Sequence, residues 1–155
     1  REYLKREYCR CRRSCGVVSL MIIDVDNFKT VNDSLGHLAG DYVLEELAGC
    51  MEKVLRQSDM LARFGGDEFA IILPDTSAEM AQYCIGRLQA AVDSHRFTWN
   101  GQRLEVGLSC GLASSSEIEP NENEEALIVL ADRRLYRHKG RPGRYSYRQV
   151  EGDQS

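Results

Sequence analysis

The most informative segment of the sequence is Arg63-Phe64-Gly65-Gly66-Asp67-Glu68-Phe69-Ala70-Ile71-Ile72-Leu73-Pro74. In this segment two glycines join two apolar, strand-like runs. A two-residue hairpin loop needs positive φ angles, which only glycine adopts freely, so the Gly65-Gly66 pair predicts a β-hairpin. Asp67 and Glu68 would then lie where a buried strand reaches the surface, a costly place for two charges unless a cation or ligand uses them. The segment therefore predicts a hairpin with functional acids at its tip.

A second acidic position follows another predicted strand. Residues 17–23 form a nearly continuous apolar run, typical of a strand covered on both faces, and Asp24 follows directly. If this strand pairs with the one at 67–73, the carboxylates of Asp24 and Asp67 converge. Two carboxylates and a backbone carbonyl, that of Val25, would suit Mg²⁺, which keeps its other coordination positions for water and phosphate oxygens.

Further motifs accompany these two segments in a fixed order. They are Asp24-Val25-Asp26-Asn27-Phe28-Lys29, Asn32-Asp33-Ser34-Leu35-Gly36-His37-Leu38-Ala39-Gly40-Asp41, Arg63-Phe64, Leu108-Ser109-Cys110-Gly111-Leu112-Ala113, Ala131-Asp132, Leu135-Tyr136 and Lys139. Together with Gly65-Gly66-Asp67-Glu68-Phe69, this set resembles the GGDEF domain family, from about residue 16 to about residue 144. One short motif could arise by chance, but the ordered set could hardly do so. The resemblance implies a diguanylate cyclase, which condenses two GTP into the bacterial second messenger cyclic di-GMP and releases two pyrophosphates.

Helices and strands are mixed along the rest of the chain. We expect a helix over 1–14, a strand over 17–24, a short helix capped by Asp26 and ending near Gly36, a helix at 44–55, a helix begun by the capping box Thr76-Ser77-Ala78-Glu79, a strand at about 104–112, a loop over 114–123 and a final helix over 126–135. This mixture indicates an α+β fold. The resemblance implies a central, mainly antiparallel sheet flanked by helices, like the palm of nucleotide cyclases and polymerases. With 155 residues and 43% hydrophobic content, the chain is expected to form one domain over 1–155.

Composition excludes several classes of protein. A net charge of −4 disfavours nucleic acid as a partner. No apolar stretch approaches the roughly 20 residues that cross a bilayer, and the chain does not begin with a signal peptide. Among the six cysteines, the closely spaced Cys9, Cys11 and Cys15 lack an evident fourth metal ligand, so we expect structural thiols. Since an enzyme that uses GTP works in the reducing cytoplasm, we expect no disulfides and a cytoplasmic location, alone or as the cytoplasmic part of a membrane-anchored protein.

The resemblance assigns the acids to metal binding and catalysis. Phosphoryl transfer needs metal ions on the phosphates and a nucleophile held in line. Asp24, Asp67 and the carbonyl of Val25 are the expected ligands of Mg²⁺ or Mn²⁺, with two ions per active site when GTP is bound. The family gives Glu68 a catalytic role, either helping the metal or drawing a proton from the 3′-hydroxyl. The plainer alternatives are a helix-capping acid for Asp24 and a solvated turn acid for Glu68.

Two segments are expected to hold the triphosphate. Free N–H groups of Asn27, Phe28 and Lys29 at a helix N-terminus attract phosphate, and the Lys29 ammonium adds charge. By resemblance, Lys139 binds phosphate from the C-terminal basic cluster, although such clusters are usually solvated faces. The sequence departs from the family there, because His138 replaces an alanine, the segment is one residue longer and Tyr145 replaces an asparagine. Arg144 is the expected arginine of this segment, with Arg141 as the alternative.

Recognition of the base is expected from Asn32 and Asp41. Guanine presents N1–H and an amino group as donors and O6 as an acceptor, so a carboxylate can take the donors while an amide donates to O6. In the family the position of Asp41 separates guanine-specific cyclases from promiscuous ones, and its Asp favours GTP. As bare residues, Asn32 would be a turn residue and Asp41 an acid in the first turn of a helix.

One regulatory motif precedes the hairpin. Arg56-Gln57-Ser58-Asp59 has the form Arg-x-x-Asp and ends six residues before Gly65, where the family has its inhibitory site for the product. An arginine fork binds phosphate or a guanine edge, and an aspartate accepts guanine donors. Arg87 would reach the same ligand from the next helix. As a bare pattern, Arg-x-x-Asp is weak.

The resemblance also carries expectations about assembly. Each domain would bind one GTP and the product joins two, so a homodimer is required for catalysis. The family's usual opening motif is missing, so we expect a fragment of a longer protein with an upstream sensory or regulatory domain. Two alternatives remain open: a catalytically silent module that binds GTP or cyclic di-GMP, and a cyclase that also accepts ATP.

Overall fold

The computed structural model describes residues 1–139. In chain order its elements are α1 (Glu2–Arg13), β1 (Val18–Asp26), α2 (Phe28–Leu35), α3 (His37–Val54), β2 (Met60–Arg63), β3 (Glu68–Pro74), α4 (Ala78–Ser94), β4 (Phe97–Trp99), β5 (Gln102–Leu104), β6 (Gly107–Ser114), the 3₁₀ turn η1 (Ser115–Glu117) and α5 (Glu124–His138). No helix within residues 1–139 is long and apolar enough to span a bilayer. All six cysteines are free thiols.

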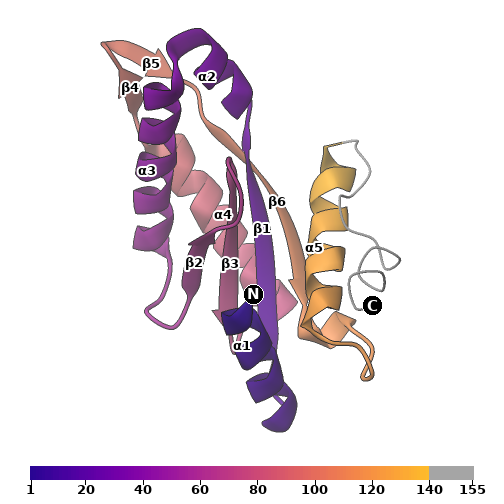
Figure 1. Ribbon diagram of the computed structural model, residues 1–155. Coiled ribbons are helices and arrows are strands. Elements are labelled where there is room, and N and C mark those ends of the chain that lie inside the picture. Colours follow the sequence, from indigo (N-terminus) through magenta and orange to yellow (C-terminus); the bar gives the residue numbers. More distant parts are fainter. Residues whose placement is uncertain (140–155) are drawn as a thin grey trace.

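A four-stranded sheet forms the centre of the fold, in the order β2-β3-β1-β6 (Figure 1). Each neighbouring pair is antiparallel. The two central strands are the apolar runs of the sequence: every residue of β3 is buried, and so is every residue of β1 except Asp26. The expected antiparallel α+β sheet flanked by helices is therefore confirmed.

The two faces of the sheet carry separate cores. Side chains alternate along a strand, so Met21, Ile23 and Val25 of β1 pack against α3 and α4, whereas Leu20 and Ile22 pack against α1 and α5. Figure 1 shows these helix pairs on opposite sides of the sheet. Burial on both faces explains why β1 and β3 lack polar alternation.

Helix α5 lies closer to the sheet than ordinary side chains allow. A Cβ placed on Gly111 of β6 would lie 2.0 Å from the backbone oxygen of Ala131 and 2.6 Å from the backbone nitrogen of Leu135. The contact is backbone against backbone, and only glycine permits it. This approach brings the C-terminal end of α5 to the end of β1.

The predicted hairpin is confirmed, but its loop differs from the prediction. The β2–β3 pairing ends at Arg63 and Phe69, and the N–H of Phe64 donates to the carbonyl of Glu68 at 2.8 Å, so the loop is longer than two residues. Neither Gly65 nor Gly66 has a positive φ. Arg63 holds the loop instead, because its guanidinium donates to both glycine carbonyls, at 3.3 and 2.7 Å.

Two predicted helix starts are wrong by one or more residues. Asp26 is the last residue of β1, and Asn27, with φ 55°, caps α2. The capping box at 76–79 is absent, because Ser77 is the N-cap and accepts from the N–H of Met80 at 3.3 Å. The hydroxyl of Thr76 donates to the carbonyl of Pro74 at 2.8 Å, so it is not available to cap the helix.

The prediction also missed regular structure on both sides of α4. Helix α3 begins at His37, directly after Gly36 (φ 90°), and not at residue 44. The hairpin β4–β5 was not predicted, although its loop is Asn100-Gly101 with φ 49° and 77°. Asn-Gly is the strongest short hairpin signal, so this element was readable from the sequence.

Candidate active site

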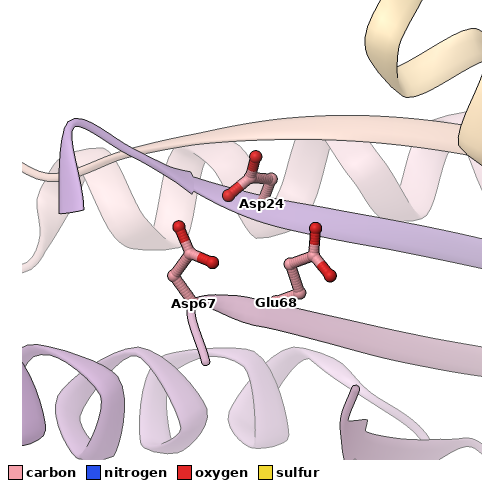
Figure 2. A group of neighbouring side chains, drawn as sticks. All are labelled: Asp24, Asp67 and Glu68. Atoms are coloured by element: carbon pink, nitrogen blue, oxygen red, sulfur yellow. The ribbon is translucent and has the colours of Figure 1, made fainter. Parts of the chain in front are cut away.

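Three carboxylates meet where β1 ends and β3 begins. The register of the two strands places Asp24 opposite Glu68, and the N–H of Val25 donates to the carbonyl of Asp67 at 3.0 Å. One carboxylate oxygen each of Asp24, Asp67 and Glu68 lies within 4.8 Å of the other two. Figure 2 shows these side chains facing one another from neighbouring strands. The predicted convergence of Asp24 and Asp67 is therefore present in the structure.

The electrostatics of this cluster fit a divalent cation. Burial raises the pKa of Asp67, and the nearby charge of Asp24 raises it further. Asp24 and Glu68 are only 7% and 5% exposed. The Oδ1 atom of Asp24 is buried and accepts no hydrogen bond from residues 1–139. Hard carboxylate oxygens, one of them buried without a hydrogen-bond donor, are a set of ligands that suits a divalent cation.

Lys139 reaches this cluster from the end of α5. Its ammonium lies 2.6 Å from Oδ2 of Asp24 and 3.5 Å from Oδ1 of Asp26. On the same helix, the hydroxyl of Tyr136 donates to Oε1 of Glu68 at 3.4 Å. Lys139 thus supplies the positive charge beside the acids, a contact that its predicted phosphate role did not include.

A cleft opens beside the acids at the start of α2. It has a volume of about 540 Å³ and is lined by Asp24, Val25, Asp26, Asn27, Phe28, Lys29, Thr30, Asp67 and Lys139. The first N–H groups of a helix have no intrahelical acceptor, which leaves those of Phe28 and Lys29 for a ligand. The left-handed Asn27 turns the chain from β1 into α2. One cleft therefore holds the following predicted metal and phosphate residues: Asp24, Val25, Asn27, Phe28, Lys29, Asp67 and Lys139.

The predicted base-binding residues lie on the neighbouring helices α2 and α3. Oδ1 of Asn32 is buried without a partner in the described chain, and a Cβ on Gly40 would lie 2.0 Å from it. Asp41 follows Gly40, is exposed and lines a second cavity of about 490 Å³ together with Phe69 of β3. Gly40 has a role that the sequence did not reveal, because it lets α2 approach α3.

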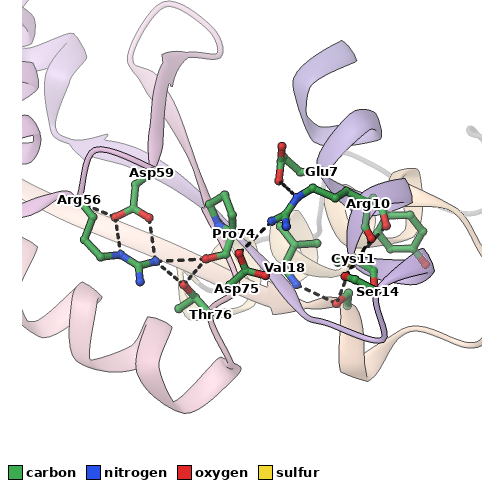
Figure 3. A network of polar contacts seen from close by, with 12 residues as sticks. Glu7, Arg10, Cys11, Ser14, Val18, Arg56, Asp59, Pro74, Asp75 and Thr76 are labelled. Atoms are coloured by element: carbon green, nitrogen blue, oxygen red, sulfur yellow. Dashed lines mark hydrogen bonds and ion pairs between the residues drawn. The ribbon is translucent and has the colours of Figure 1, made fainter.

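The Arg-x-x-Asp residues form a third pocket at the opposite end of β3. Arg56, Asp59 and Arg87 line it, with a volume of about 140 Å³. The guanidinium of Arg56 donates to both carboxylate oxygens of Asp59, at 3.0 and 3.4 Å, and to the hydroxyl of Thr76 at 2.6 Å (Figure 3). Arg87 donates to the carbonyl of Val54 at 3.0 Å. The three predicted residues are therefore brought together.

The C-terminal basic cluster divides into different environments. Arg134 donates to the carbonyl of Leu112 at 2.7 Å and to both oxygens of Glu117 at 2.8 and 2.9 Å, which makes it a structural residue. The hydrogen bond from Arg134 lowers the pKa of Glu117. The predicted phosphate ligand Arg144 and its alternative Arg141 lie outside the described residues.

Sequence comparison agrees with this geometry. The family model described as "Diguanylate cyclase, GGDEF domain" matches residues 1–144. Diguanylate cyclase DgcP of Pseudomonas aeruginosa is 44% identical over 143 residues, which cover 92% of this chain and 21% of that protein. Probable diguanylate cyclase DgcE of Escherichia coli is 45% identical over 111 residues, which cover 72% of this chain and 10% of that protein. The chain thus spans a small part of the length of these relatives.

Solved structures share the fold. Diguanylate cyclase SiaD of Pseudomonas aeruginosa, solved with its activator SiaC, superposes with a TM-score of 0.84 at 34% identity, over 90% of this chain and 52% of that one. The GGDEF domain of DgcB from Caulobacter crescentus, solved with c-di-GMP, gives a TM-score of 0.82 at 27% identity, over 92% and 84%. With the acid cluster in place and the family model matching nearly its whole length, the chain belongs to the GGDEF domain family of diguanylate cyclases.

Proposed function

We propose that this domain makes cyclic di-GMP from two GTP molecules. The 3′-hydroxyl oxygen of one GTP attacks the α-phosphorus of the other, the bond to the bridging oxygen breaks, and pyrophosphate leaves; repetition in the opposite sense closes the ring. The observation that carries the proposal is the meeting of Asp24, Asp67 and Glu68 within 4.8 Å, beside a cleft with helical N–H groups. Phosphoryl transfer depends on such positioning and charge neutralisation.

Each side chain then has a defined part. Mg²⁺ or Mn²⁺, two ions with GTP bound, would be held by Asp24, Asp67 and the Val25 carbonyl, and would neutralise phosphate charge and polarise the phosphoryl oxygens. The N–H groups of Phe28 and Lys29 bind the terminal phosphates. Glu68, buried beside the cleft, accepts the proton of the 3′-hydroxyl.

Lys139 changes partner in this scheme. Without a ligand it pairs with Asp24 at 2.6 Å, the position where a cation would compete with it. Lys139 also lines the cleft, so its ammonium can bind phosphate there when Asp24 would hold a cation instead. Lys139 therefore keeps the acids compensated until substrate and metal arrive.

We infer that guanine is the base. The Asp41 carboxylate accepts from guanine N1–H and the amino group, and the amide nitrogen of Asn32 donates to O6. Adenine presents an unprotonated N1 to Asp41, so ATP leaves the carboxylate without its donors, and we expect GTP to be used in preference to ATP.

Two domains must face each other for this reaction. Each holds one GTP, so we propose a homodimer, at least transient, working in the cytoplasm where GTP is abundant. The Arg56, Asp59 and Arg87 pocket then binds the product and inhibits synthesis. Two arginines near an aspartate provide donors for phosphate and acceptors for guanine.

The test is incubation of the nucleotide-stripped chain with GTP or ATP and Mg²⁺ at several protein concentrations, with products resolved by mass. We expect cyclic di-GMP from GTP alone, at a rate rising faster than linearly with protein. Asp67→Ala should abolish the product, while Asp93→Ala, which removes an exposed acid of α4, should not. If no dinucleotide forms even when dimerisation is forced, while cyclic di-GMP still binds, the chain is a binding module and the enzyme proposal is wrong.

A further inference from the structure

The proposed product pocket contains a carboxylate that has no part in the scheme above. Asp75 directly follows β3, has a left-handed backbone (φ 51°) and lines the same cavity as Arg56 and Arg87. Its side chain is 64% exposed, and Oδ2 accepts a hydrogen bond from Nη2 of Arg10 at 3.0 Å. Figure 3 shows Arg10 reaching Asp75 from α1, and Arg10 itself is not among the residues that line this pocket.

Arg10 is held in place for this contact. Its Nε donates to Oε2 of Glu7 at 2.8 Å, one turn earlier on α1, and Glu7 is only 8% exposed. The Nη2 edge is thereby aimed at Asp75. An arginine fixed between two carboxylates loses less side-chain entropy on pairing than a free surface arginine.

The turn that carries Asp75 is itself rigid. The carbonyl of Pro74 and the hydroxyl of Thr76 accept from Nη2 of Arg56 at 3.2 and 2.6 Å. The hydroxyl of Ser19 donates to the carbonyl of Thr76 at 2.7 Å, which fixes the turn to β1. One side of the turn thus contacts Arg56, and its middle residue contacts α1 through Arg10.

The pocket's charge then depends on α1. Its lining includes two arginines, Arg56 and Arg87, and two aspartates, Asp59 and Asp75, so these charges balance. A ligand with two phosphodiesters is a dianion and is repelled by an uncompensated carboxylate in the wall. Arg10 compensates Asp75 and leaves the pocket positive toward the ligand.

We propose that the Arg10–Asp75 ion pair sets the affinity of this pocket for an anionic dinucleotide, so that the docking of α1 controls product binding. The inference rests on the proposed product site. By thermodynamic reciprocity, the bound dinucleotide strengthens the docking of α1 by the same factor. Asp75 faces the ligand in this scheme, whereas Arg10 lies outside the pocket and acts through Asp75.

The experiment is calorimetric titration of the full chain with cyclic di-GMP at low ionic strength. Arg10→Gln should weaken binding by about three- to fivefold, the range of a partly exposed ion pair, and high salt should erase the difference. Arg13→Gln, which removes an exposed arginine from the same helix, is the matched control and should bind like wild type. In the double variant Arg10→Gln/Asp75→Asn, affinity should return to at least the wild-type value.

The outcomes separate the two proposals. If Arg56→Ala abolishes binding while Arg10→Gln binds as tightly as Arg13→Gln and wild type, the ion-pair inference is wrong and the product site stands. No binding by wild type, or binding that ignores Arg56→Ala, would remove the product site and the inference with it. Should Arg10→Gln fail to fold by circular dichroism, Asp75→Asn alone decides, because weaker binding by that variant contradicts the proposal.

Discussion

At one end of β3, Asp24, Asp67 and Glu68 crowd together, with one buried carboxylate oxygen unpaired within the described chain. At the other end, Arg56 and Asp59 bind each other, and the Asp59 side chain is 3% exposed. The first site gathers three carboxylates around a single ammonium of the described residues, that of Lys139, so negative charge remains for a cationic ligand to neutralise. In the second site Arg56 and Asp59 already bind each other, so a ligand must compete with the hydrogen bonds between them. One strand thus carries a site that costs stability at its start and one that contributes stability at its end.

The largest effect expected from this contrast is on turnover. Asp67→Ala should lower the initial rate of cyclic di-GMP synthesis on the order of a thousandfold, since it removes a ligand of the phosphate-bound metal. The same variant should bind cyclic di-GMP within about twofold of wild type, because distant sites behave independently. Loss of both properties in a folded variant would mean that the two ends are not separate sites.

Next in size is the stability of the paired end. Arg56→Ala should lower the free energy of unfolding by about 1–3 kcal/mol, because the nearly buried Asp59 carboxylate loses the guanidinium and keeps only the backbone N–H of residue 56, at 2.8 Å. Urea denaturation monitored by circular dichroism measures this change. Arg13→Ala removes an exposed arginine of α1 and serves as the control. An equal fall in the free energy of unfolding of the two variants would contradict the argument.

Removing a charge from the acid cluster should raise the free energy of unfolding, the opposite of the effect at the paired end. Without metal, Asp67→Asn should raise the free energy of unfolding by about 0.5–2 kcal/mol at neutral pH, as expected when a strained functional charge is removed. The pKa of Asp67 is raised above its ordinary 3.8, so its ionisation destabilises the fold as pH rises through the folded value. The gain should disappear at pH below 3.8, and Mg²⁺ should stabilise wild type but not the variant. A destabilised variant at neutral pH in EDTA would show that Asp67 is structural.

The smallest expected change in stability concerns Glu117, a carboxylate that lies outside both sites and serves as a reference for them. Arg134 lowers the pKa of Glu117 below its ordinary 4.5, so Glu117 stabilises the fold above that value and the contribution is lost as pH falls through the lowered pKa. Both side chains are partly exposed, so Glu117→Gln should cost about 0.2–1 kcal/mol at pH 7. Urea midpoints of wild type and variant should converge in acid; a constant gap would contradict this origin.

The sequence predicted the parts of the molecule that local patterns determine. The apolar run of β1 ends at Asp24 and that of β3 follows Asp67, so antiparallel pairing of these strands was enough to predict the acid cluster. Asn100-Gly101 would have predicted β4–β5 by the same logic. The length of the Gly65-Gly66 loop was predicted wrongly. The guanidinium of Arg63 donates to the carbonyls of both glycines and so holds the loop, and the sequence pattern does not indicate these hydrogen bonds.

Other features depend on contacts between residues far apart in the chain. Asp75 pairs with Arg10 across 65 positions, and Lys139 reaches Asp24 across 115. The sequence predicted that Thr76 begins a capping box, but its hydroxyl donates to the carbonyl of Pro74 and accepts a hydrogen bond from the guanidinium of Arg56. In each case a nonlocal partner overrides a weak local preference, so residue types alone could not predict the pairing.

The direct contact of Gly111 with the α5 backbone makes this glycine a spacer for catalysis. The size of residue 111 fixes how near α5 lies to the sheet, and therefore how far Lys139 and Tyr136 extend over the acids. A single methyl group at this position would act like a shim, lifting both side chains away from the site at once. Because that methyl group would meet backbone atoms of Ala131 and Leu135, helix and sheet would have to separate. The place of Lys139 and Tyr136 beside the acids is thus set by a residue that lies outside the acid cluster.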